Sequence, residues 1–293
     1  MLANTSDTPE EAVERLDQIK AAAGIPKDVD GDVVIVPKKD GSEEKRVWKE
    51  LIFSPTPAMR RILVAALGIH FFQQATGSDS VVLYGPRVFQ SAGITGENRL
   101  LGATCAVGVT KTLFILVATF QLDRAGRRPL LLASTAGMFV CLIGLGTGLT
   151  VVGRHPDTKI TWAIGLCIAC ILAYVSFFSI GLGPITSVYT SEVFPLRVRA
   201  LGFAVGASCN RVTSAAVSMS FLSLSKAITI GGSFFLYAGI TALGLIFFYT
   251  FIPETRGQPL EDIGKLFGMT DDAAVEADQG TAPKEKVKVV EMS

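Results

Sequence analysis

Charged residues are scarce in this sequence, since only 18% of its 293 residues are Asp, Glu, Lys or Arg. The formal net charge is +1, which excludes the basic excess typical of nucleic-acid binding and the acidic excess typical of solvating disorder. The two histidines, His70 and His155, have no plausible partners for a metal site, and no nucleophile lies beside a base. We therefore expect neither a metal centre nor an enzyme.

Cysteine is also rare, and all five cysteines lie inside apolar runs. A thiol in such a run behaves as a small hydrophobic group, so no disulfide framework is expected. Cys167 and Cys170 have CxxC spacing, but no strand or turn flanks them, which favours packing over redox chemistry. The residues after Met1 lack the basic start and apolar centre of a secretory signal, so we expect no export directed by this N-terminus.

Apolar residues are abundant instead: they make up 49% of the chain, and the mean hydropathy is +0.44. Six apolar stretches are each near the roughly 20 residues that cross about 30 Å of hydrocarbon as a helix. These predicted spans are 62–84, 100–121, 129–152, 160–186, 200–225 and 230–252. The sequence thus predicts an all-α membrane protein with six transmembrane helices and both termini on one side.

Arginines indicate which side holds the termini. They cluster before the first predicted span and after the second, fourth and sixth, which by the positive-inside rule places both termini in the cytoplasm. Three parts are expected: a cytoplasmic domain at 1–57 that begins with a short amphipathic helix, a six-helix bundle at 58–254, and a cytoplasmic tail at 255–293. The tail is polar after about residue 268 and is expected to be largely disordered there.

Three charged residues, Asp79, Lys111 and Arg211, lie near the middle of predicted spans. A charge at that depth costs about 3 kcal/mol or more unless water, a partner or a ligand reaches it. One interpretation is an internal ion-pair network that holds the bundle together. Because Gln73 and Gln74 add further hydrogen-bonding groups nearby, we favour a polar cavity.

Two predicted spans carry residues that interrupt helices. Asp79 and the neighbouring glutamines face different sides of a straight helix, so they line one cavity only if the helix breaks near Gly77. The fourth span has Gly181, Gly183 and Pro184 in close succession, and packing through small residues explains the glycines but not the proline. We expect hinges at both places, because transporters expose polar groups to a solute at broken helices near mid-depth.

Three loops on the arginine-rich side each combine an acid with arginine: "DRAGRR" at 123–128, "EVFPLRVR" at 192–199 and "PETRG" at 253–257. A single such loop is adequately explained as a topology anchor. Three together favour salt bridges between helix ends, which would lock one state of a rocking bundle. The candidate side chains are Asp123, Arg124, Arg127, Arg128, Glu192, Arg199, Glu254 and Arg256.

Taken together, these motifs resemble those of the sugar porter family of the major facilitator superfamily. "QQATGSD" at 73–79 resembles the family's QQxxGxN motif, and "DRAGRR" resembles its [DE]RxGRR loop. The run from "GLGPI" to "SEVFPLRVRALG" resembles GxGPI followed by E-x6-R, and "PETRG" resembles PETKG. The likeness covers nearly the whole chain but one half of the family's fold, namely a central cytoplasmic domain and the last six of twelve helices.

Within that family the sequence is most similar to plant polyol and monosaccharide proton symporters. The resemblance implies alternating access in the plasma membrane, with the proton as coupling ion and no other cofactor. We add the hypothesis that Lys111 lies near Asp79, where its charge would hold the carboxylate ionised at neutral pH. The implied substrate site consists of Gln73, Gln74, Asp79, Lys111 and Asn210, facing a second six-helix half.

The sequence departs from the family pattern at several positions. Ser187 stands where many members have tryptophan, Ser179 where glucose carriers have glutamate, and Ser78 where isoleucine is usual. The first six helices, and the acid that the resemblance assigns to proton coupling, are absent from this sequence. Two alternatives therefore remain open: a truncated, non-transporting membrane protein that acts through a partner, and a passive sugar uniporter.

Overall fold

The computed structural model describes residues 55–91, 96–155 and 160–256, and all regular structure within these residues is α-helical. The expected cytoplasmic domain and tail lie almost entirely outside the described residues. The helices are α3 (Pro57–Ala75), α4 (Ser78–Leu83), α5 (Gly85–Ser91), α6 (Glu97–Ala125), α7 (Arg127–Arg154), α8 (Thr161–Ile180), α9 (Leu182–Val193) and α10 (Leu196–Phe251).

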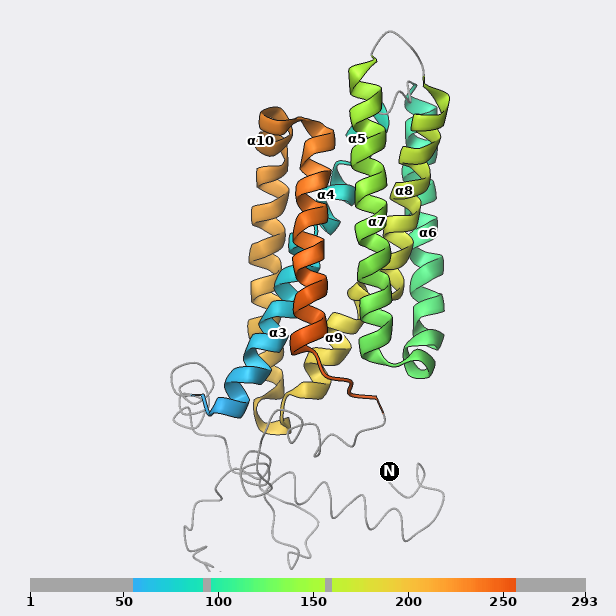
Figure 1. Cartoon of the computed structure of the whole chain (residues 1–293). Helices are drawn as coiled ribbons and strands as arrows, with labels where there is room; N and C mark the ends of the chain where they lie inside the picture. The colour runs from blue at the N-terminus through green and yellow to red at the C-terminus, as the bar shows by residue number, and fades with distance from the viewer. Residues whose placement is uncertain (1–54, 92–95, 156–159, 257–293) are drawn as a thin grey trace, which may run out of the picture.

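Four described segments are long and apolar enough to cross a membrane: Leu100–Leu122, Arg127–Arg154, Thr161–Val193 and Val198–Phe251. The last has 54 residues and would extend for about 80 Å as a straight helix, far more than one crossing needs. It folds back at Thr229, whose φ of 71° and ψ of 160° are not helical. The first arm (196–228) and second arm (230–251) of α10 therefore correspond to the two last predicted spans (Figure 1).

The first predicted span, 62–84, forms two helices. Thr56 caps α3 by accepting a hydrogen bond from the backbone N–H of Met59 at 3.3 Å, and Pro57 occupies the first turn, where its missing N–H costs nothing. The helix ends at Ala75, and Gly77 has a left-handed φ of 83° before α4 begins. The expected break near Gly77 is therefore present in the structure.

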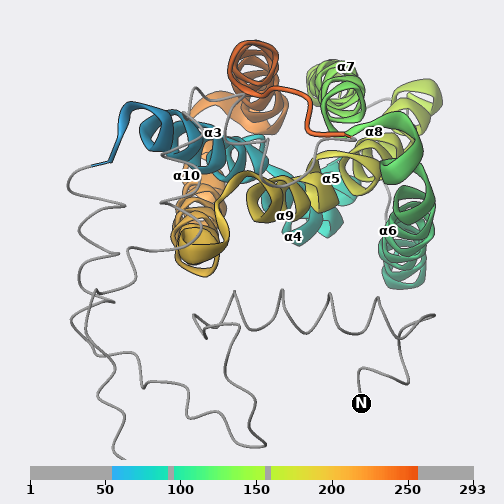
Figure 2. The same ribbon diagram turned by 90° about the horizontal axis from the view of Figure 1, so that it is seen from below.

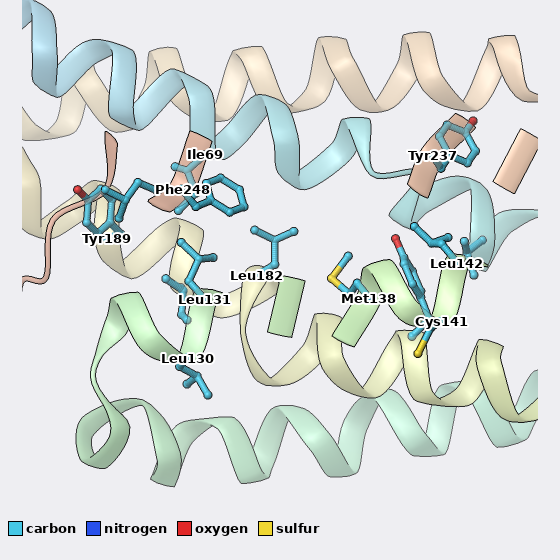
Figure 3. Close-up of a cluster of buried hydrophobic side chains, with 14 of the residues drawn as sticks. Ile69, Leu130, Leu131, Met138, Cys141, Leu142, Leu182, Tyr189, Tyr237 and Phe248 are labelled. Carbon is cyan, nitrogen blue, oxygen red and sulfur yellow. The ribbon is translucent and has the colours of Figure 1, made fainter. Parts of the chain in front are cut away.

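The core lies where α3, α7, α9 and the second arm of α10 meet. Figure 3 shows Ile69, Leu131, Leu182 and Phe248, one from each of these elements, gathered in one buried cluster. Helix α7 packs against α10 on one side and α8 on the other, and α6 lies at the edge against α8 (Figure 2). Most of the apolar surface of α6 is exposed, as expected for a helix that faces lipid.

The arginine-bearing loops lie at one end of the bundle. The start of α3, the α6–α7 turn, the α9–α10 turn and the end of α10 all point the same way in Figure 1. This grouping is the geometric condition that the positive-inside argument requires.

Gly77→Ala is expected to destabilise the bundle. A Cβ at this position would sit 2.7 Å from the Tyr237 ring, and the left-handed conformation costs a non-glycine residue about 1–2 kcal/mol. We expect the unfolding temperature in detergent to fall by roughly 2–8 °C. Gly165→Ala is the matched control, because a Cβ there meets nothing within 4 Å, and the better helix propensity of alanine should leave the unfolding temperature unchanged or slightly higher. Equal unfolding temperatures for the two variants would show that the helix break at residue 77 does not depend on glycine.

Candidate functional site

Three buried amide side chains form the centre of the site. Gln73 and Gln74 end α3, and Asn210 lies on the first arm of α10. Asn210 Nδ2 donates to Gln73 Oε1 at 2.6 Å and to the His70 carbonyl at 3.2 Å, and Gln74 Nε2 donates to Asn210 Oδ1 at 3.2 Å. This amide cluster (Gln73, Gln74 and Asn210) joins three of the five residues that sequence reasoning assigned to the substrate site.

The amide cluster also reaches the break in the predicted fourth span. Helix α8 ends at Ile180, and Gly181 has φ −116° and ψ −87° before α9 begins. Gln73 Nε2 donates to the carbonyls of Leu182 at 3.1 Å and Gly183 at 3.0 Å. A Cβ on Gly181 would lie 2.0 Å from Ser134 Oγ, so this position accepts no side chain without rearrangement. The predicted interruption at Gly181, Gly183 and Pro184 is therefore observed.

Asp79 lies beside the amide cluster, in the first turn of α4 and half-buried. Its Oδ2 accepts a hydrogen bond from Ser214 Oγ on the first arm of α10. The break at Gly77 also turns Ser78 back, so that its hydroxyl donates to Gln74 Oε1 at 3.0 Å. Sequence reasoning missed Ser214, although its position one helical turn after Asn210 places both on one face.

Lys111 and Arg211 do not join the amide cluster. Lys111 is half-buried on α6, Arg211 is exposed on the first arm of α10, and neither side chain forms an ion pair or hydrogen bond with a described residue. Lys111 was expected near Asp79, but the two side chains form no ion pair in this structure. The alternative interpretation, an ion-pair network joining Asp79, Lys111 and Arg211, is not observed either.

His70 is a packing histidine with one polar contact. Its Nε2 lies 3.2 Å from Thr190 Oγ1 on α9, and its ring fills the space left by Gly206, where a Cβ would lie 2.5 Å away. The side chain is buried and meets the edge of Phe203. It therefore connects α3 to α9 next to the amide cluster.

A second polar cluster joins helix ends at the arginine-rich end of the bundle. Arg127 at the start of α7 forms a salt bridge to Glu192 on α9, with Nη2 2.9 Å from Oε1 and Nε 3.2 Å from the same oxygen. The other oxygen of Glu192 accepts from Thr255 Oγ1 at 2.8 Å. The helix-end cluster (Arg127, Glu192, Glu254 and Thr255) thus ties α7, α9 and the segment after α10 together.

Glu254 caps α7 from a distant part of the chain. Gly126 precedes α7 and offers no side-chain cap, but Glu254 Oε1 accepts from the backbone N–H of Arg127 and Oε2 from that of Arg128, each at 3.0 Å. A carboxylate there satisfies two free N–H groups and interacts favourably with the helix dipole. The acid of "PETRG" therefore bonds to backbone, whereas sequence reasoning expected salt bridges.

The remaining loop residues have other roles. Arg128 Nη2 donates to the Tyr249 carbonyl at 2.7 Å, and Arg199 Nε donates to the Phe194 carbonyl at 3.2 Å. Arg256 is exposed, and its backbone N–H donates to Glu254 at 3.0 Å. The side chains of Asp123 and Arg124, at the end of α6, lie outside the described part of the structure.

These features define a class of protein: a polytopic membrane bundle whose helices are interrupted near mid-depth and present polar groups there, as in secondary transporters. The chain belongs to the family "Sugar (and other) transporter", whose model matches residues 5–267. Sugar porters of the major facilitator superfamily, and plant polyol transporters among them, are the proteins that it resembles.

Among its relatives, the chain is 55% identical to "Putative polyol transporter 1" of Arabidopsis thaliana, over 92% of this chain and 52% of that protein. It is 32% identical to "Major myo-inositol transporter IolT" of Bacillus subtilis, over 83% of this chain and 50% of that protein. The chain spans about half the length of the curated relatives it matches.

Solved structures show the same fold. A D-xylose-proton symporter matches with a TM-score of 0.61 and 27% identity, over 78% of this chain and 52% of that one. The proton:xylose symporter XylE bound to 6-bromo-6-deoxy-D-glucose matches with a TM-score of 0.67 and 24% identity, over 89% of this chain and 50% of that one. The described bundle is thus the C-terminal half of a major facilitator fold.

Glu254→Ala is expected to lower stability, because two N–H groups of α7 lose their partner. The cost should resemble that of a lost N-cap, about 1–2 kcal/mol, or roughly 2–8 °C in unfolding temperature. Glu254→Gln should retain part of the stability, since its carbonyl oxygen still accepts. Glu97→Ala is the control, because Glu97 is exposed at the start of α6. Identical unfolding temperatures for Glu254→Ala and Glu97→Ala would contradict the capping role.

Proposed function

We propose that this chain is the C-terminal half of a secondary carrier of polyols or monosaccharides that works by proton symport and alternating access. The observation that carries the proposal is the amide cluster, bonded to backbone carbonyls at one helix break and adjacent to another. Support comes from the family and from relatives named as polyol and myo-inositol transporters. Coupling to protons is supported by the likeness to a D-xylose-proton symporter.

Amide groups suit a polyol because each offers both donors and an acceptor, as each hydroxyl does. In the chain alone, the amides of Gln73, Gln74 and Asn210 satisfy one another. We propose that solute hydroxyls replace some of these bonds when a second six-helix half closes the site. Asp79 then accepts from a further hydroxyl, and Lys111 contributes a donor from α6 across the site.

Alternating access requires the helix-end contacts to open and close. Helix α9 is held at its start by Gln73 and at its end by the salt bridge between Glu192 and Arg127. The break at Gly181 separates it from α8, so we propose that α9 turns about this point. The arginine-rich end would face the cytoplasm of a plasma membrane carrier, and opening there would break the helix-end cluster.

Uptake tests the proposal directly. The chain is to be expressed in transport-deficient yeast together with the half of Putative polyol transporter 1 that it does not cover. We expect saturable uptake of sorbitol, mannitol, myo-inositol or a hexose, with external alkalinisation recorded by electrode on solute addition. Uptake without alkalinisation would indicate a uniporter. No uptake by correctly localised halves that co-purify would favour the non-transporting alternative.

Asn210→Ala is expected to raise the KM of uptake, because a solute hydroxyl that bonds to the Asn210 amide in the proposed site would lose its partner. A buried hydroxyl left unpaired costs about 1–3 kcal/mol, which corresponds to roughly a 10- to 100-fold loss of apparent affinity. Ser220→Ala on the same arm is the control, since the Ser220 side chain is exposed and its hydroxyl bonds to the Val217 carbonyl of its own helix. If the KM of Asn210→Ala lies within twofold of the KM of the control, the amide cluster is not part of the solute site.

A further inference from the structure

Two cations lie near mid-depth without a partner among the described residues. Lys111 is about 14 residues from either end of α6, or about 21 Å by helical rise. Arg211 lies about 22 Å after the start of α10 and about 27 Å before its fold at Thr229. Neither side chain is long enough to reach an end of its helix, so neither charge escapes the apolar layer in that way.

The charges at this depth do not balance within the described residues. Asp79 supplies one negative charge and Lys111 and Arg211 supply two positive charges, which leaves a net charge of about +1 in a medium where unpaired charge is costly. One oxygen of Asp79 is bonded by Ser214. Even if Asp79 paired with one cation, the other would remain. The remaining cation therefore needs water or a counter-charge from outside these residues.

Small or polar side chains lie on both sides of Arg211 and on the N-terminal side of Lys111, whereas Ile115 lies one turn after Lys111. Thr104 and Gly108 lie two turns and one turn before Lys111 on the same face of α6. At the same helical spacings, Ala204, Ser208 and Ala215 surround Arg211 on the first arm of α10, where all three are exposed. Figure 2 shows α6 and this arm on either side of α4 and α9.

These stripes of small or polar side chains differ from the lipid-facing sector of α6, which carries Val109, Leu113 and Phe120. Small side chains let another helix approach closely, as they do at helix contacts in membranes. The stripes and the unbalanced charge therefore lie together on what we name the open face: α4, α6 and the first arm of α10.

We infer that the second six-helix half, packed on the open face, carries a carboxylate at the depth of Arg211, and that this carboxylate pairs with the Arg211 guanidinium. The inference rests on the proposed function, in which such a half completes the carrier. The relatives are about twice as long as the matched segment, so they have room for that domain. A polyol or monosaccharide is neutral and supplies no counter-charge. Arg211 is the more exposed of the two cations, and its planar guanidinium can donate two parallel hydrogen bonds to one carboxylate.

Co-purification tests this pairing without relying on transport. The tagged chain is expressed with the uncovered half of Putative polyol transporter 1, and the recovered second half is measured. Arg211→Gln should reduce recovery at least tenfold, and Arg211→Lys should keep most of it. Lys226→Gln, a control on an exposed cation near the end of the same arm, should change nothing. The unfolding temperature of the Arg211→Gln chain alone should equal that of the unchanged chain, because Arg211 has no described partner.

Suppressor substitutions identify the partner of Arg211. In the Arg211→Gln background, one Asp→Asn or Glu→Gln change at mid-depth in the second half should restore recovery to within twofold. Rescue by Asp79→Asn instead, no rescue by any acid, or unchanged recovery for Arg211→Gln would each overturn the inference. The inference would also be overturned if a differently tagged copy of this chain were recovered in place of the second half. Normal co-purification without uptake would contradict the proposed function and leave this pairing intact.

Discussion

Polar side chains buried inside an apolar bundle must find partners within that bundle, and much of this structure follows from that constraint. The amide of Gln73 donates to the carbonyls of Leu182 and Gly183, in the first turn of α9 just after the break at Gly181. The other end of that amide is fixed by Asn210 on α10. One side chain therefore links the end of α3, the start of α9 and the first arm of α10, next to the second break at Gly77.

Helix α9 is the element that both polar clusters share. The amide cluster bonds to its first turn, and the helix-end cluster bonds to Glu192 in its last turn. Glu254 simultaneously fixes the start of α7, against which Glu192 is held through Arg127. Displacing α9 would thus break contacts at two depths at once, which favours two discrete arrangements over a gradual tilt.

The breaks at Gly77 and Gly181 and the number of spans were readable from sequence, because glycine and proline inside an apolar run disfavour an uninterrupted helix. The hydrogen-bond partner of each polar group could not be predicted from the sequence. Glu254 bonds to backbone far away in the chain, Ser214 bonds to Asp79, and Lys111 remains apart from that carboxylate. Such contacts depend on the rotation of each helix about its axis, which hydropathy and motif spacing do not determine.

The amide cluster also limits how tightly a solute could bind. In the proposed site, each hydroxyl that bonds to Gln73, Gln74 or Asn210 replaces a bond these residues already make with one another. Exchange of one hydrogen bond for another gains little free energy, about 1 kcal/mol or less per bond. Under this proposal, affinity comes chiefly from Lys111, from the oxygen of Asp79 that Ser214 does not bond, and from the second half. A carrier gains from this arrangement, because a solute held weakly by exchanged bonds is also released on the other side of the membrane.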